Sequence, residues 1–402
     1  MNLQEVLNRE LDIIKKGVYE IIGEKDLIEK INVSHRNNRP LEIKMGIDPS
    51  GPHIHLGHVV VLKKVRDLQN LGHNATIIIG DFTGKIGDPA GNFKRQISLS
   101  TIELMKNAEN YKGQILKILD KKRTKIVFNS NWLRDLDIDN IIDIVKKLPI
   151  TNIIHKEILS KGCRNNELID VPQYLYPMIQ GYDSVYLKAD IEIGGYDQKA
   201  NILIGRMLQQ EMGYDVQCGI LMPILEGIDG KRKMSKTYKN YIGIEESPES
   251  IVTKIMSMPN ELIIPYFNMI TDIDKHTISS YEKSIEANKN IKFIKLILAK
   301  EIIRLCKESE GTATSYKEIV KMGYTKENMR EVILEDKKSD IVNIMIIARL
   351  VPNKEEAKEL ISRNQVKING KDIINENMVI EHGDIIAINE DKYVKICYEE
   401  EN

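Results

Sequence analysis

The stretch PSGPHIHLGH, from Pro49 to His58, places three histidines and two glycines within ten residues of a chain that has only eight histidines. The preceding segment, Ile43 to Ile47, alternates apolar and other residues and predicts a strand. From His58 to Leu71 the apolar residues recur at helical spacing, and Gly72 ends the pattern. The histidines and glycines are therefore expected on a turn that leads from a strand into a helix.

Two interpretations of this turn are open. The N-terminus of a helix offers unpaired N–H groups and the positive end of its dipole, which suit a phosphate. Gly51 and Pro52 would shape the turn, Gly57 would let a ligand approach the backbone, and His55 and His58 could donate to phosphate oxygens. Alternatively, the glycines only tighten the turn and the histidines cap the helix.

The segments downstream continue the alternation of strands and helices. ATIIIGDFTG (75–84) and TKIVFNS (124–130) are predicted strands, and the segment from about 136 to 170 is predicted as a helical insertion. This order favours an α/β fold, a parallel sheet covered by helices on both faces. Ligands of such sheets lie at the carboxyl ends of the strands, where the turn, DFTGKIGDP and FNSN should converge.

The length of 402 residues favours two or three domains. After Gly243 a helical pattern runs to about Asp336, as in a small bundle. From Lys337 an apolar helix, an amphipathic helix and short alternating strands predict a small α+β unit. We therefore expect domains over 1–245, 246–336 and 337–402.

Composition excludes several classes of protein. Lys and Arg total 58 against 59 for Asp and Glu, so nucleic acid would have to bind at local patches, and DNA is not an expected partner. No apolar run is long enough to cross a bilayer, and the first residues predict an amphipathic helix, not a signal peptide. We expect a cytoplasmic protein without a membrane partner. No metal site or disulfide framework is predicted, because the cysteines are scattered: Cys163, Cys218, Cys306 and Cys397.

A second motif, KRKMSKT (231–237), favours the phosphate-binding interpretation of the first. Alone, such a basic loop is most often a solvated surface. After H-L-G-H at the start of a helix, K-M-S-K-T completes the two signatures that are typical of class I aminoacyl-tRNA synthetases. This resemblance implies that the catalytic residues are His55, His58, Lys233 and Lys236, and that the loop closes as a lid over ATP.

The chain resembles the bacterial-type tyrosyl-tRNA synthetases over its whole length, through GIDPSGPHIHLGH, YLYPMIQGYDS (174–184) and IEIGGYDQKANI (191–202). The resemblance implies a Rossmann-like catalytic domain, an α-helical anticodon-binding domain and an S4-like RNA-binding domain. It further implies that L-tyrosine and ATP form tyrosyl-adenylate and that tyrosine passes to the 3′ end of tRNA. A homodimer, joined through the insertion, is also implied. Mg²⁺ would arrive with ATP, and no tightly bound cofactor is expected.

Three polar residues fit the tyrosine-pocket pattern Y-x-x-x-Q-x-x-D of this family: Tyr176, Gln180 and Asp183. Their spacing of four and three places them on one face of a helix. The alternative is a buried polar face that only caps a neighbouring loop. By resemblance, tyrosine would also contact Thr83, Asp88, Asn129 and Gln198, while the nucleotide would contact Gly46, Asp48, Gly57, Gly195 and Asp197 together with the four catalytic residues.

The chain departs from the family pattern at two places. Lys44 stands where many members carry a tyrosine that faces the substrate phenol, so the phenol contact is expected to depend more on Asp183. The segment GDPAGNFKR lacks the usual basic residue directly after G-D-P-S. The basic residue that assists pyrophosphate is then Lys94 or Arg95.

The C-terminal segment ARLVPNKEEAKELISRNQVKING resembles an S4-type RNA-binding unit. From Arg349 to Lys371 it holds six basic and three acidic residues. A locally basic face suits the RNA backbone, and the residues expected to bind it are Arg349, Lys354, Lys358, Arg363 and Lys367. Without the synthetase signatures, a small solvated domain without a ligand would be the preferred interpretation.

The predicted activation step needs no general base, because the amino-acid carboxylate is itself the nucleophile. Positioning and charge stabilisation are what the site must supply. Two other functions compete with the tyrosine enzyme. One is a tryptophanyl enzyme or another nucleotidyl-transferring relative, and the other is a non-catalytic RNA-binding paralogue.

Overall fold

The computed structural model describes residues 3–88, 100–148, 171–307, 330–334, 340–369, 371–373, 378, 380–388 and 392–398. The chain divides into two compact units. The first spans residues 1–227 and 231–245, and the second spans residues 228–230 and 246–402. The division into three domains stays a prediction.

A six-stranded sheet forms the centre of the first unit, in the order β1-β6-β5-β2-β3-β4. All neighbouring strands except β1 run parallel, so the predicted parallel sheet is confirmed. β1 was not predicted; it pairs antiparallel with β6 at the edge. The strands are β1 (Glu20–Ile22), β2 (Glu42–Ile47), β3 (Asn74–Ile79), β4 (Thr124–Phe128), β5 (Ile191–Gly195) and β6 (Cys218–Met222).

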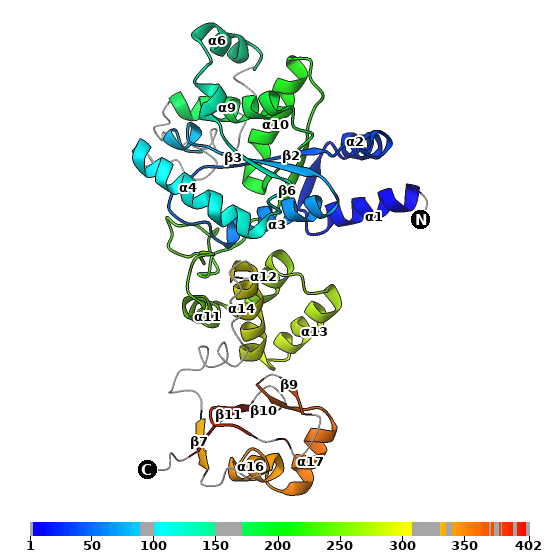
Figure 1. Cartoon of the computed structure of the whole chain (residues 1–402), viewed down its shortest axis with the longest axis vertical. Coiled ribbons are helices and arrows are strands. Elements are labelled where there is room, and N and C mark those ends of the chain that lie inside the picture. Colours follow the sequence, from blue (N-terminus) through cyan, green and yellow to red (C-terminus); the bar gives the residue numbers. More distant parts are fainter. Residues whose placement is uncertain are drawn as a thin grey trace. The chain divides into compact units, whose positions relative to one another are not determined.

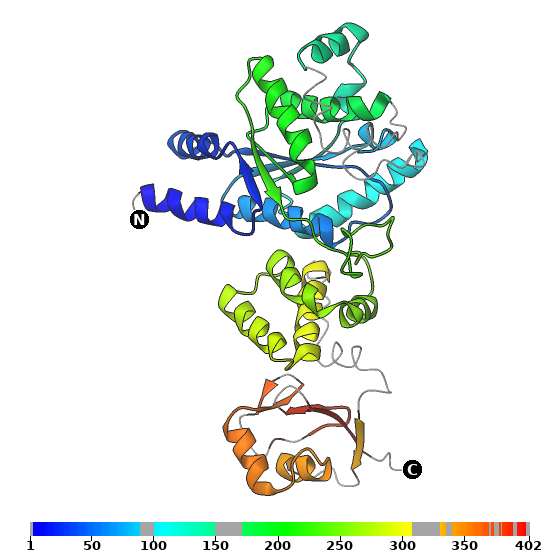
Figure 2. The same cartoon turned by 180° about the vertical axis from the view of Figure 1, so that it is seen from behind.

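Helices cover both faces of this sheet, as predicted. α3 (Leu56–Asn70) and α4 (Thr101–Ile118) lie on one face, and α9 (Val171–Leu187) and α10 (Lys199–Glu211) lie on the other (Figures 1 and 2). Burial from both sides explains why Ile77, Ile78 and Ile79 of β3 are consecutive apolar residues. The unit also contains α1 (Leu3–Lys15), α2 (Glu24–Asn37), η1 (Thr83–Lys85), α5 (Ser130–Leu133), α6 (Ile138–Lys146) and η2 (Tyr196–Gln198).

The predicted helical insertion is described only in part. α6 lies within it, with Asp137 as its N-cap, whose side chain accepts from the Asn140 amide. Residues 149–170, the remainder of the predicted insertion, fall outside the described residues.

The second unit begins with helices that bury an apolar core, including Ile251, Phe267 and Leu298. They are α11 (Pro248–Ser257), η3 (Asn260–Leu262), α12 (Ile263–Ile270), α13 (Lys275–Glu286) and α14 (Ile291–Lys307). The buried amine of Lys295 donates to the carbonyls of Met256 and Met258, so it satisfies acceptors at the end of α11.

The C-terminal part of this unit is a five-stranded sheet in the order β7-β11-β10-β8-β9. Its strands are β7 (Arg330–Leu334), β8 (Val366–Ile368), β9 (Lys371–Asp372), β10 (Ile385–Ile388) and β11 (Lys392–Tyr398). The predicted alternating strands near 366 and 385 are confirmed. The prediction of helix up to about Asp336 is wrong at its end, because β7 pairs in parallel with β11.

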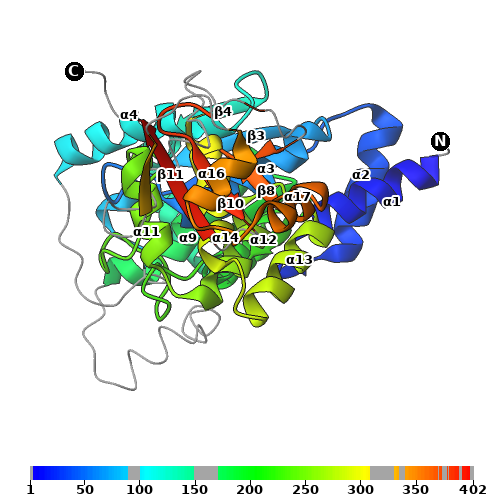
Figure 3. The ribbon, with the colours of Figure 1, turned by 90° about the horizontal axis from the view of Figure 1, so that it is seen from below.

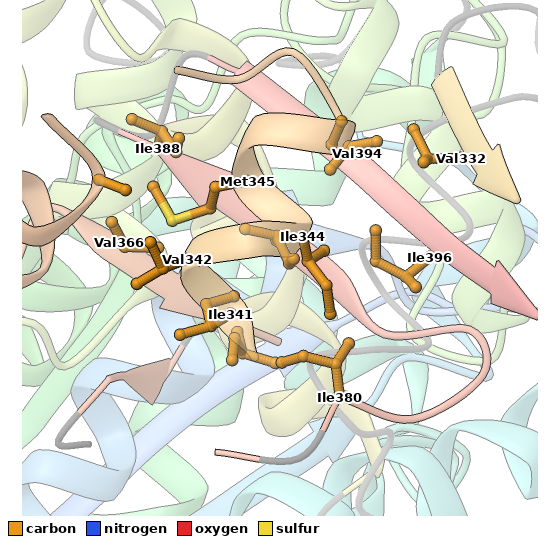
Figure 4. Close-up of a cluster of buried hydrophobic side chains, with 14 of the residues drawn as sticks. Val332, Ile341, Val342, Ile344, Met345, Val366, Ile380, Ile388, Val394 and Ile396 are labelled. Carbon is orange, nitrogen blue, oxygen red and sulfur yellow. The ribbon is translucent and has the colours of Figure 1, made fainter. Parts of the chain in front are cut away.

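One face of this sheet is covered by α16 (Ile341–Ile347), and α17 (Lys354–Ser362) follows it (Figure 3). Ile344 and Met345 of α16 pack with Ile388 and Val394 of the strands in one buried cluster (Figure 4). The tail therefore has an apolar core made from its own elements. No described helix of the chain is long and apolar enough to cross a membrane.

Candidate active site

The turn before α3 is built by both of its histidines. His55 is the N-cap, and its Nδ1 accepts from the Gly57 amide at 3.2 Å. His58 Nδ1 accepts from the His55 amide at 3.2 Å, which completes a reciprocal cap. The interpretation that the histidines cap the helix is thus correct for the Nδ1 atoms of both rings. In the neutral ring the proton then lies on Nε2, so each histidine keeps one donor for a ligand.

Both imidazoles are held in the neutral form. Burial lowers the pKa of His55 well below its ordinary value and that of His58 to about 3. The two rings lie 3.9 Å apart between centroids, and the nearby charges of Lys233 and Lys236 lower both pKa values further. The structure therefore brings the two sequence motifs together, although about 175 residues separate them along the chain.

The lysines of the KMSKT loop each contact a protein partner. Lys233 Nζ lies 3.1 Å from Asp197 Oδ2, and both side chains are about one-third exposed. Lys236 Nζ donates to the Tyr111 hydroxyl of α4 at 2.5 Å. Burial lowers the pKa of Lys236 to about 8. The two lysine amines that are expected to contact ATP are thus bonded to Asp197 and Tyr111 in this structure.

The backbone of this loop is fixed by one buried side chain. Asn240 accepts from the Ser235 amide at 2.8 Å and donates to the Lys233 carbonyl at 3.1 Å. Residues after the loop bond to the strand-to-helix turn: the Leu56 amide donates to the Ile242 carbonyl. These bonds anchor the loop to Asn240 and the segment after it to the start of α3.

Asp48, directly after β2, bonds to two residues of the predicted tyrosine group. It accepts from Thr83 Oγ1 at 2.7 Å and from the Tyr176 hydroxyl at 2.9 Å. Gly80 allows this approach, since a Cβ there would overlap Asp48 Oδ1 and Thr83 Oγ1. Burial raises the pKa of Asp48 to about 7, and Asp88 and Asp183 add to the rise.

Asp183 lies on the buried face of α9. It accepts from Trp132 Nε1 at 2.8 Å and from Asn129 Nδ2 at 3.4 Å. Asn129 also donates to Thr83 Oγ1 at 3.1 Å. Burial raises the pKa of Asp183 to about 7, opposed by the charge of Lys44 and by these donors. A neutral donor such as a phenol would suit this carboxylate.

The remaining predicted tyrosine ligands form a second chain of contacts. Gln180 Nε2 donates to Gln198 Oε1 at 3.2 Å, and Gln198 Nε2 donates to Asp88 Oδ2 at 2.5 Å. Asn201 of α10 donates to the same Asp88 carboxylate at 3.4 Å. All seven predicted tyrosine ligands therefore belong to hydrogen-bonded groups at the carboxyl edge of the sheet.

Three glycines of the predicted nucleotide site lie near the ends of strands or at the start of a helix, and their contact with the nucleotide stays a prediction. Gly46 lies next to the end of β2, Gly57 lies in the first turn of α3, and Gly195 ends β5. A Cβ on Gly57 would lie 3.0 Å from the His55 ring, so the cap requires a small residue there. Lys94 and Arg95 lie outside the described residues.

Sequence reasoning missed four residues that shape the site: Tyr111, Trp132, Glu192 and Asn240. Glu192 of β5 lies 2.9 Å from Lys44 Nζ and is buried. A charged residue in the middle of an apolar strand was the available signal for it, since a buried charge requires a partner. Lys44 itself points to Glu192, Gln180 and Ser184.

The five predicted RNA-binding residues lie on and around α17. Arg349, Lys354, Lys358 and Arg363 are exposed, and Lys367 of β8 is half-buried. Arg363 pairs with Glu359 at 2.6 Å. Among the described residues, no group of three or more His, Cys, Asp or Glu side chains could hold a metal ion, and none of the described cysteines, Cys218, Cys306 and Cys397, is in a disulfide.

Comparison with known proteins identifies the family. Residues 36–322 match the model of the class I tRNA synthetases for tryptophan and tyrosine. "Tyrosine--tRNA ligase 2" of Clostridium acetobutylicum is 42% identical over 98% of this chain and 99% of its own length. "Tyrosine--tRNA ligase" of Haemophilus influenzae is 40% identical over 92% of each chain.

Solved structures agree in fold. The tyrosyl-tRNA synthetase of Archaeoglobus fulgidus, complexed with L-tyrosine, has a TM-score of 0.63 and 22% identity over 76% of this chain and 99% of its own. That of Aeropyrum pernix has a TM-score of 0.62 and 17% identity over 79% of this chain and 98% of its own. The expected Rossmann-like fold is thus confirmed. With its paired histidine and lysine motifs at one sheet edge, the chain belongs to the bacterial tyrosyl-tRNA synthetases of class I.

Proposed function

We propose that this chain joins L-tyrosine to ATP, forming tyrosyl-adenylate and pyrophosphate, and then transfers tyrosine to the 3′ end of its tRNA. Family membership supports the activity. The observation that carries the choice of amino acid is Asp183, a buried carboxylate on the helix α9 that also carries Tyr176 and Gln180. A face that only caps a loop does not require a buried aspartate, Asp183, beside a partly buried one, Asp48, both with a raised pKa.

The histidines and lysines act on the phosphates of ATP. The tyrosine carboxylate attacks the α-phosphorus, and the bond to pyrophosphate breaks, so negative charge grows on the leaving group. Neutral His55 and His58 donate from Nε2 without adding charge to the ground state. Lys233 and Lys236 leave Asp197 and Tyr111 to stabilise pyrophosphate as the loop closes. Asp197 is then released to meet the ribose.

The acidic groups hold the amino acid. Asp88 and Asp183 repel the carboxylate of Asp48, which is part of why the pKa of Asp48 is raised. A bound α-ammonium group, placed toward Asp88, relieves that repulsion, and Gln198 approaches the tyrosine carboxylate. Asp183 accepts the phenolic hydroxyl, and phenylalanine would leave it without that donor.

Mg²⁺ enters with ATP as part of the substrate complex, held mainly by phosphate oxygens and water. No tightly bound cofactor takes part in the proposed reaction. By analogy with the bacterial relatives, we place the reaction in the cytoplasm.

The tRNA would be bound by two further domains, an α-helical anticodon-binding domain within 246–336 and an S4-like domain from about 337, extended at its start by β7. Exposed Lys354 and Lys358 lie four residues apart on one face of α17, which suits phosphate contact. The apolar core of the tail supports its independent folding.

A homodimer is the proposed assembly. α6, within the predicted insertion, exposes Ile138, Ile141, Ile142 and Val145, whose exposed fractions range from 38% to 67%. Four exposed aliphatic side chains on a nine-residue helix suit burial against a second copy. The double substitution Ile138→Glu/Ile142→Glu should then shift the sedimenting species from dimer to monomer.

ATP–pyrophosphate exchange with each aromatic amino acid tests the activity. Tyrosine should drive exchange far better than tryptophan or phenylalanine. Preference for tryptophan would favour the tryptophanyl alternative. Absence of exchange with every amino acid, together with intact tRNA binding, would favour the non-catalytic paralogue.

A chain that ends before Arg330 tests the role of the tail, since this end also removes β7. Exchange should be retained, because every residue assigned to activation lies before Tyr238. Charging of tRNA should collapse, and tRNA binding by the full chain should weaken as salt rises. Unchanged charging after truncation would contradict the proposed RNA-binding role.

A further inference from the structure

A buried ion pair lies beneath the predicted tyrosine pocket. Lys44 of β2 and Glu192 of β5 face each other directly in the register of the two parallel strands. Lys44 Nζ lies 2.9 Å from Glu192 Oε1, and the two side chains are only 1% and 3% exposed. Two charges that are removed from water at such a place are costly unless they are paired. The buried pair is therefore expected to have a specific role.

Lys44 has no donor left for a ligand. An ammonium group has three N–H donors. Lys44 uses them on Glu192 Oε1 at 2.9 Å, Ser184 Oγ at 2.7 Å and the Gln180 carbonyl at 2.9 Å. It therefore cannot take over the direct phenol contact of the tyrosine that many family members carry at this position without losing one of these bonds.

The partners of the pair flank Asp183 on α9. Ser184 follows Asp183 in sequence, and Gln180 precedes it by one turn. Glu192 accepts from Gln180 Nε2 at 3.2 Å and from Ser184 Oγ at 3.1 Å. Gln217 adds a third donor at 2.5 Å. The pair thus ties the ligand-bearing turn of α9 to two strands of the sheet.

The pair also acts on the charge of Asp183. Lys44 favours the ionised carboxylate and Glu192 opposes it. The other ionisable groups that interact with Asp183 are Asp48, directly after β2, and Tyr176, on α9. Trp132 and Asn129, after β4, add uncharged donors. Lys44 is the cation among these groups.

We propose that Lys44, balanced by Glu192, is a positioning residue that holds Asp183 in place and in its ionised form, and thereby determines specificity for a phenolic amino acid. The site would take an amino acid whose side chain ends in a hydroxyl donor. The inference rests on the proposed function for the identity of that ligand. The effect of Lys44 on Asp183 does not depend on it.

Trp132 provides a direct readout in the ligand-free enzyme. It is the only tryptophan of the chain, and its Nε1 donates to Asp183 at 2.8 Å. Its fluorescence should therefore change as Asp183 takes up a proton. Asp183→Asn should abolish this transition, which separates it from the titration of Asp48.

Lys44→Met should move the midpoint of the Trp132 transition upward by about one pH unit or more, because an attractive charge is lost. Glu192→Gln should move it downward, because a repulsive charge is lost. The double variant Lys44→Met/Glu192→Gln should lie between the two single variants. A structural role alone would lower stability without moving the midpoint in opposite directions.

Lys64→Met is the matched control. Lys64 is also buried, but its amine donates to the carbonyls of Ile13, Ile14 and Lys16 at the end of α1. Its loss should lower thermal stability and leave the Trp132 midpoint unchanged. If Lys44→Met does not fold, Glu192→Gln decides the question: an unchanged or upward midpoint overturns the proposal.

Exchange kinetics then test specificity. In Lys44→Met, kcat/KM for tyrosine at pH 7 should fall by about fivefold, since raising the midpoint from about 7 to about 8 lowers the ionised fraction of Asp183 from about one half to about one tenth. The loss should be recovered as pH rises, with KM for ATP unchanged. A loss that is equal at every pH overturns the inference. Absence of tyrosine exchange in the unmodified enzyme would instead contradict the proposed function, whatever Trp132 shows.

Discussion

In the proposed tyrosine pocket, polar side chains bind one another: Asp183 to Trp132 and Asn129, and Asp48 to Thr83 and Tyr176. In the proposed nucleotide half, Lys233 and Lys236 bond to Asp197 and Tyr111, which ATP would replace, and Lys233 and Asp197 are about one-third exposed. On this assignment the pocket is organised before tyrosine binds, whereas Lys233 and Lys236 would exchange their partners when ATP binds. Losses in the first region should appear in tyrosine binding, and losses in the second in the rate of adenylate formation.

Asp183→Asn should produce the largest effect on the pocket. Removing the charged acceptor from a buried site should lower kcat/KM for tyrosine by about 10³, with KM for ATP nearly unchanged. Steady-state exchange kinetics measure both. Asp190→Asn is a matched control, since Asp190 is also buried but pairs with Lys30 and Arg39. Equal losses for tyrosine and ATP would mean that Asp183 does not belong to the pocket alone.

Lys233→Ala and Lys236→Ala should each slow adenylate formation by about 10², because each removes a donor to charge that develops on pyrophosphate. Tyrosine affinity, measured by equilibrium binding, should stay the same. Lys231→Ala in the same loop, where the side chain is exposed, should change the rate by less than about threefold. If these substitutions weakened tyrosine binding and left the forward rate intact, the proposed separation of roles between the two regions would be contradicted.

Tyr111→Phe should have a smaller effect of opposite sign. It removes the hydroxyl that accepts from Lys236 and keeps the ring. Since one hydrogen bond contributes about 1 kcal/mol, KM for ATP should fall about fivefold. If KM for ATP rises instead, Tyr111 orients Lys236 for the reaction and does not compete with ATP.

The smallest predicted effect is on the pH dependence of stability. The histidines of one region and the aspartates of the other change stability in opposite directions as pH changes. His55 and His58 have pKa values below the unfolded value of about 6.5, so their contribution to stability is lost as pH falls below 6.5. Asp48 and Asp183 have pKa values of about 7 in the folded chain, so stability declines as pH rises from about 4 to 7.

Thermal unfolding followed by Trp132 fluorescence separates the two contributions. Relative to the unmodified protein, His58→Gln should gain stability toward acid pH. Tyr182→Phe serves as a neutral control on the pocket side, because it removes no group that titrates in this range. A change of about 1 kcal/mol in the free energy of unfolding shifts the melting temperature by about 2–4 °C in a domain of this size. A gain by His58→Gln at pH 7 instead of acid pH would contradict the assignment.

The sequence predicted the residues whose chemistry and spacing are local. The strand, the turn and the helix around His55 and His58 follow from periodicity, and the shared face of Tyr176, Gln180 and Asp183 follows from helical spacing. These elements depend on contacts only a few residues apart. The structure agrees with each of them.

The missed residues depend on contacts across the fold. Lys44 meets Glu192 only because β2 and β5 pair in one register, across about 150 residues of chain. Tyr111 meets Lys236 only when α4 packs beside the loop. β7 was missed because its partner β11 lies about 60 residues further on, and the expected helical region ran across it.

The bond between Leu56 and Ile242 also bears on how the protein is made. The Ile244 amide likewise donates to the Ile54 carbonyl, so the turn at His55 is completed by residues near 243. During synthesis the N-terminal strands leave the ribosome long before those residues do, and contacts of such sequence separation form late. A nascent chain that stops before residue 242 would have its histidines but not the segment that fixes them. Competence to use ATP should therefore arise only once this catalytic unit is almost fully translated.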